Sequence, residues 1–84
     1  MNNSKIVHNL NITEEYQAGL RYGEDPAARP HYERAIELAE EHEAFPHAYY
    51  QAHERLIKLY EFVGEKPKAV YYRKRLEEVI KQDK

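Results

Sequence analysis

The chain has 84 residues, of which 42% are hydrophobic and 33% charged, with a formal net charge of −2. This length supports one domain with a small core, and eight tyrosines are too many for a disordered tail. The absence of cysteine excludes a disulfide scaffold, thiolate catalysis and a cysteine-ligated zinc site, and the frequent charges exclude a membrane-spanning segment.

Residues 1–10 are expected to form a flexible N-terminal tail, followed by a single α-helical domain over residues 11–82. The tail contains no apolar stretch of the length that a secretory signal needs, so we expect a cytoplasmic protein.

The first predicted helix follows this tail. Asn11 or Thr13 can cap it, and Glu14 and Glu15 would then lie in the first turn, where carboxylates suit the helix dipole. Gly23 is expected to end the helix. The positions that follow a helical repeat are Tyr16, Gly19, Leu20 and Gly23.

A second helix completes a hairpin over about residues 12–44. Asp25 and Pro26 read as a cap and a first helical residue. Pro30 leaves two alternatives, either a loose turn over residues 26–29 or a regular helix that begins near Pro30. The helix should end before Pro46, because a residue before proline avoids the α region. Its predicted inward positions are Tyr32, Ala35, Ile36 and Ala39.

A second hairpin is expected over about residues 46–82. Pro46 opens its first helix, Gly64 ends that helix, and Pro67 begins the last one. The predicted inward positions are Tyr49, Ala52, Leu56, Leu59, Tyr60 and Val63, then Ala69, Tyr72, Leu76, Val79 and Ile80. Leu56, Tyr60, Ile36 and Leu76 are expected at the centre of the core. No alternating run predicts a strand, so the fold class is all-α, with four helices.

An internal repeat joins the two hairpins. Residues 23–28 recur as residues 64–69, with four identities in six positions and a spacing of 41 residues. The repeat resembles the tetratricopeptide repeat, a helix–turn–helix unit. The matching positions are Tyr16, Leu20, Gly23, Ala28, Tyr32 and Ala35 in the first copy and Leu56, Tyr60, Gly64, Ala69 and Tyr72 in the second. The departures are Ile57, Leu76 and a spacing above the family's 34 residues.

This resemblance implies a non-catalytic scaffold, built as a right-handed stack of hairpins, that binds a protein segment or a second copy of itself. A small helical bundle is the structural alternative. In the family the first helix of each pair lines a concave groove. The residues this implies are Glu14, Gln17 and Arg21 from the first copy and Gln51, Glu54, Arg55 and Lys58 from the second. The alternative is that these are ordinary solvated side chains.

Self-association is a further expectation. Phe62, Val70 and Tyr71 lie off the main apolar stripes, where a monomer would expose them. Residues 1–47 carry four basic and nine acidic side chains, whereas residues 48–84 carry nine basic and six acidic ones. Opposite charges on the two halves would favour contact between copies, so we expect a homodimer.

Catalytic and metal chemistry find little support. His47 and His53 are six residues apart and point in different directions on a helix, so we expect no metal site. Ser4 lies in the predicted tail and Thr13 at a predicted cap position, which suits neither for nucleophilic catalysis. We therefore expect neither an enzyme nor a bound cofactor.

The basic last helix suggests two alternatives to a scaffold. A small phage or bacterial regulator could inhibit or recruit a larger enzyme through this helix. Residues 66–75 also interleave basic and aromatic side chains in a way that could contact nucleic acid. The pI of about 6.2 argues against nucleic acid, because modules that bind it are usually strongly basic.

Overall fold

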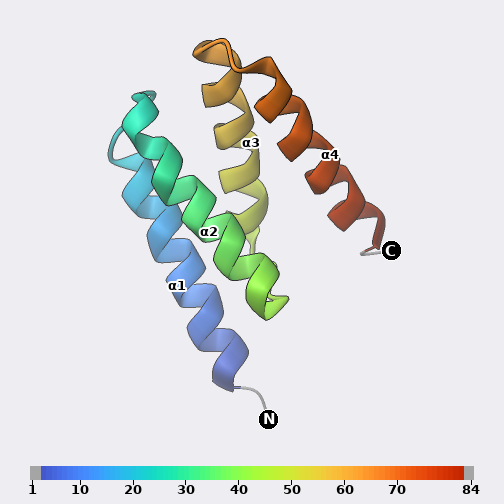
Figure 1. Cartoon of the computed structure of the whole chain (residues 1–84). Helices are drawn as coiled ribbons and strands as arrows, with labels where there is room; N and C mark the ends of the chain where they lie inside the picture. The colour runs from blue at the N-terminus through green and yellow to red at the C-terminus, as the bar shows by residue number, and fades with distance from the viewer. Residues whose placement is uncertain (1–2, 83–84) are drawn as a thin grey trace.

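The computed structural model describes residues 3–82 and has an all-α fold. Figure 1 shows how its helices are arranged. In chain order the elements are α1 (Asn3–Leu20), a 3₁₀ turn η1 (Pro26–Ala28), α2 (Arg29–His42), α3 (His47–Phe62) and α4 (Lys66–Gln82). No strand occurs within residues 3–82. The predicted class, all-α with four helices, is confirmed.

Helix α1 begins at Asn3, well before the predicted start at Asn11 or Thr13. The Thr13 hydroxyl donates to the Asn9 carbonyl at 2.8 Å, so it bonds within the helix instead of capping it. His8 stacks on His42 of α2 with ring centroids 3.6 Å apart, which anchors the early turns. The predicted tail is therefore wrong over residues 3–10, while residues 1–2 lie outside the described part.

The turns between the helices agree with the sequence predictions better than the start of α1 does. Gly23 adopts φ 62° after α1, and Gly64 adopts φ 84° after α3, as helix-ending glycines do. Asp25 caps η1 by accepting a hydrogen bond from the Ala27 amide at 2.8 Å. The regular helix begins at Arg29, which decides between the two predicted alternatives in favour of a start near Pro30.

The core lies between α1, α2 and α3. Ile36, Leu56 and Tyr60 are buried in it, as predicted. Tyr32 packs its ring directly over Gly19 of α1, where an ideal Cβ would lie 2.5 Å from Tyr32 Cε1. The absence of a side chain at Gly19 therefore sets how closely α1 and α2 approach.

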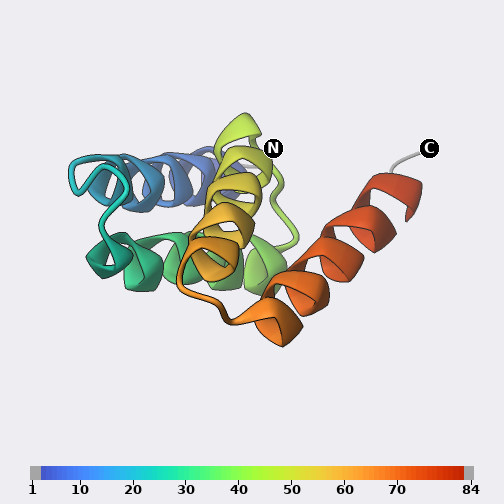
Figure 2. The same ribbon diagram turned by 90° about the horizontal axis from the view of Figure 1, so that it is seen from above.

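Helix α4 stands apart from this core. Figure 2 shows it projecting away from the other helices, and the molecule measures 44 × 29 × 16 Å. Ala69 is its buried residue, and Leu76, predicted to be central, is only partly buried. The apolar stripe of α4 is regular, but α4 packs mainly against one neighbour, so it cannot be fully covered.

Candidate functional site

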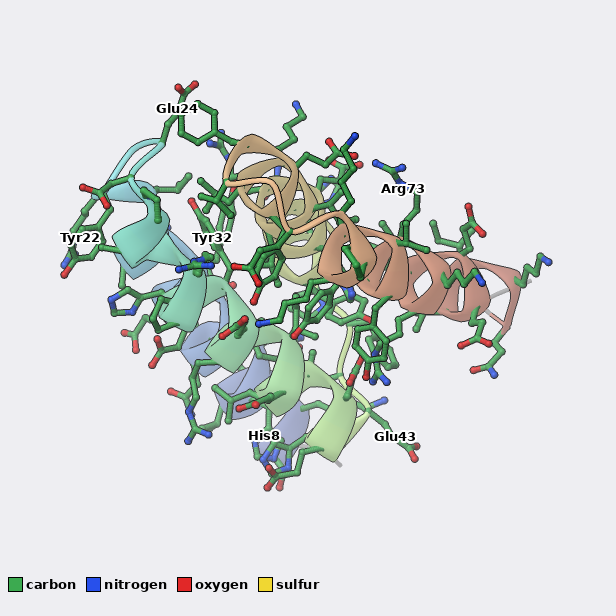
Figure 3. All side chains as sticks on the ribbon, turned by 45° about the horizontal axis from the view of Figure 1, so that its top comes forward. His8, Tyr22, Glu24, Tyr32, Glu43 and Arg73 are labelled. Carbon is green, nitrogen blue, oxygen red and sulfur yellow. The ribbon has the colours of Figure 1, made fainter. Side chains whose placement is uncertain are left out.

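A groove of about 450 Å³ runs between α3 and the turn that follows α1. Helix α3 forms one wall, and Tyr16 of α1 and Tyr32 of α2 contribute the other. Figure 3 shows Glu24 projecting outward from the turn at the end of the groove. The lining residues are Tyr16, Gly23, Glu24, Tyr32, Gln51, Glu54, Arg55, Lys58, Leu59 and Phe62.

The four site residues predicted on α3 all line this groove. They are Gln51, Glu54, Arg55 and Lys58, and each is exposed. Their spacing of three, four and seven residues places them on one side of the helix. Leu59 and Phe62 extend the same side by one more turn, so apolar and charged groups share the groove.

The three site residues predicted on α1 do not join them. Glu14 lines a separate depression of about 360 Å³ beside α2, together with His31 and Arg34. Gln17 and Arg21 are exposed and line neither depression. The predicted seven-residue groove is therefore not assembled, because α1 turns Tyr16 toward α3 and leaves these three side chains on its other sides.

Arg55 links α3 to the tyrosines on the opposite wall of the groove. Its Nε donates to the Tyr16 hydroxyl at 3.1 Å, and this bond raises the pKa of the guanidinium. The Tyr16 and Tyr32 rings lie 5.8 Å apart, and burial raises the pKa of Tyr32 while the positive charge of Arg55 opposes that rise. Arg55 is thus held in place by a phenol and carries its full charge. Within residues 3–82 it has no carboxylate partner.

The three residues predicted for self-association lie in different surroundings. Phe62 is 77% exposed and belongs to the α3 groove. Tyr71 is 53% exposed, but its hydroxyl accepts from Arg75 at 3.1 Å and the guanidinium lies 5.4 Å from its ring centre. Val70 is exposed and projects about 100° away from Tyr71 around α4. Phe62 therefore lies on α3 beside the groove, whereas Val70 and Tyr71 lie on α4.

The basic charges of α4 are partly neutralised. Arg73 bonds Glu61 at 2.7 Å, Arg75 bonds Glu40 of α2, and Lys68 lies 3.3 Å from Glu65. Figure 3 shows Arg73 extending outward from α4. This pairing lowers the positive field that a phosphate-binding helix would need.

Two features were missed by sequence reasoning. Ile6, Val7 and Leu10 lie exposed on α1, in the stretch assigned to a tail. The four-residue spacing of Ile6 and Leu10 was a signal for helix there. His53, weighed only as a metal ligand, is completely buried. Residues 3–82 contain no cluster of three side chains arranged to bind a metal.

No protein-family model, curated protein or solved structure matches this chain. The tetratricopeptide resemblance therefore stays a prediction. Over the described residues, every helix is too short or too polar to cross a membrane.

Proposed function

We propose that this protein is a non-catalytic interaction module that holds a segment of another protein in the α3 groove. The observation that carries the proposal is the placement of Phe62, which is 77% exposed at the edge of the groove. A large aromatic side chain gains little by facing water, and aromatic anchors beside arginine are typical of binding hot spots.

The groove indicates the chemistry of its occupant. An apolar side chain of the partner would pack against Phe62 and Leu59, where the lining is apolar. Arg55, Lys58 and Glu54 lack ion-pair partners among residues 3–82, so they can bond charged or polar groups that flank the apolar anchor. A short mixed-charge segment with one apolar anchor therefore fits better than a uniformly charged one.

Site-specific photo-crosslinking in the native cell tests this proposal. A photoreactive phenylalanine analogue replaces Phe62, and Glu78 on α4, which is also exposed, serves as the control position. We expect a defined heterologous adduct from position 62, lost when Arg55 and Lys58 are both changed to alanine, and none from position 78. Adducts from α4 with none from position 62 would overturn the proposal and favour a regulator that acts through α4.

A homodimer is the second candidate, favoured by apolar side chains that the fold leaves uncovered. Ile6 and Leu10 on α1 are each 60% exposed, and Val70 on α4 is 47% exposed. Light scattering at tens of micromolar tests it. A 20 kDa particle that reverts to 10 kDa on Leu10→Glu or Val70→Glu supports a dimer, and a 10 kDa particle at every concentration contradicts it.

A further inference from the structure

His53 lies on the side of α3 that faces α4 and is completely buried. Its ring meets the Tyr49 ring edge-on at 4.8 Å and the Tyr72 ring of α4 at 5.8 Å. Within residues 3–82, neither of its ring nitrogens has a hydrogen-bond partner. A buried polar group without a partner is costly, and the cost is far greater when the group is charged.

The groups around His53 give its charged form no compensation. Tyr49 on α3 and Tyr72 on α4 have raised pKa values because they are buried, so both stay neutral in acid. Arg75 of α4 adds a positive charge, and Glu40 of α2 is already bonded to Arg75 and accepts from the Tyr49 hydroxyl. Burial, with a smaller contribution from Arg75, lowers the pKa of His53 to about 4.

Helix α4 covers this side of α3, but it buries little apolar surface of its own. Ala69 is its buried residue, and Tyr72, Leu76 and Val79 are only partly covered. Gly64, in the left-handed conformation with φ 84°, lies in the turn that connects α4 to α3. Rotation about this turn would lift α4 and admit water to His53 without unfolding the packing of α1 and α2 against α3.

We propose that His53 is an acid-sensitive latch, whose protonation releases α4 from α3 while α1, α2 and α3 stay folded. The sign follows from the two states. In the closed state His53 binds its proton only near pH 4, whereas in the open, hydrated state it binds near the ordinary value of about 6.5. Closure is therefore fully favoured above pH 6.5 and weakens steadily as the pH falls toward 4. Release uncovers Tyr72, Leu76 and their contacts on α3, an apolar surface distinct from the α3 groove.

Hydrogen exchange of the full chain measures this directly. The difference between the two pKa values predicts an open population that rises roughly twentyfold between pH 7 and pH 5. Protection factors for amides 70–82, corrected for intrinsic exchange, should fall by that factor. Amides in α2 and in the buried part of α3 should change far less. The variant His53→Phe keeps the ring contacts and cannot titrate, so its α4 protection should not change between these pH values.

The controls separate the latch from general acid sensitivity. His47 is exposed at the start of α3, and His47→Gln should retain the wild-type response. The proposal is overturned if His53→Phe loses α4 protection as the wild type does, or if α2 and α4 lose protection together. A ring-proton NMR titration of wild-type His53 provides a readout independent of any variant. Titration near pH 6.5 with full α4 protection would also overturn the latch.

Discussion

Helices α3 and α4 have nearly equal length, 16 and 17 residues, yet they differ sharply in burial. Eight residues of α3 are buried, whereas α4 buries Ala69 alone among those described. Both helices carry an apolar stripe at helical spacing. The difference lies in their neighbours, because α3 packs against α1, α2 and α4, while α4 packs mainly against α3.

The same apolar stripe therefore contributes a different amount to stability in α3 and in α4. Apolar side chains that lie between several helices are fully removed from water. Those of a helix with one main neighbour stay partly exposed to solvent, so their burial stabilises the fold less. Helices α1, α2 and α3 therefore form the stable body, and α4 is an attached element whose contacts can open separately.

The largest expected effect comes from matched leucine truncations in the two helices. Leu56 of α3 is fully buried, so Leu56→Ala should lower the free energy of unfolding by about 2–5 kcal/mol. Leu76 of α4 is partly buried, so Leu76→Ala should cost roughly 1 kcal/mol because less apolar area is lost. Urea denaturation of both variants checks this order. Equal losses at the two sites would contradict the difference in burial between α3 and α4.

A second test compares two glycines. Gly19 has the Tyr32 ring where a Cβ would go, so Gly19→Ala should destabilise the body by about 1–3 kcal/mol through overpacking. Gly64 has open space around it but a φ of 84°, so Gly64→Ala should cost about 1 kcal/mol through backbone strain. Thermal melts of both variants measure the difference. A Gly19→Ala variant as stable as the parent would show that α1 and α2 are less closely packed.

The smallest expected effects concern the ion pairs of α4. Arg73 and Glu61 are exposed, so Arg73→Gln should cost no more than about 0.5 kcal/mol and less at high salt. Arg75 reaches the partly buried Glu40 of α2, which also accepts from Tyr49, so Arg75→Gln should cost more, about 1 kcal/mol. Denaturation at low and high salt distinguishes them. The reverse order would mean that Arg75 does not tie α4 to the body.

Sequence periodicity predicted the helices and much of the core because it reports which side chains share a face. It placed Ile36, Leu56 and Tyr60 correctly in the core but overestimated the burial of Leu76. The spacing of apolar residues along one helix does not reveal how many other helices will pack against that face. Sequence reasoning placed the α1 start too late, since Thr13 has the side chain of a cap but bonds within the helix.

Sequence reasoning also predicted one part of the candidate site and misplaced the other. The four α3 residues were predicted together because they share one helix face, a local property. The α1 residues were misplaced because the wall opposite α3 depends on tertiary packing, which turns Tyr16 toward the groove. The burial of His53 was missed although this residue lies four positions after Tyr49 and three before Leu56, on the predicted inward face, because its polar ring was interpreted only as a possible metal ligand.

Native-state hydrogen exchange at pH 7, with low concentrations of denaturant, tests the division into body and attached helix most directly. Amides of residues 70–82 should exchange through a partial opening at least about tenfold more populated than global unfolding, with little dependence on denaturant. Amides around Leu56 should exchange only through global unfolding. If both sets share one opening free energy and one denaturant dependence, the four helices unfold as a single unit and α4 does not open separately.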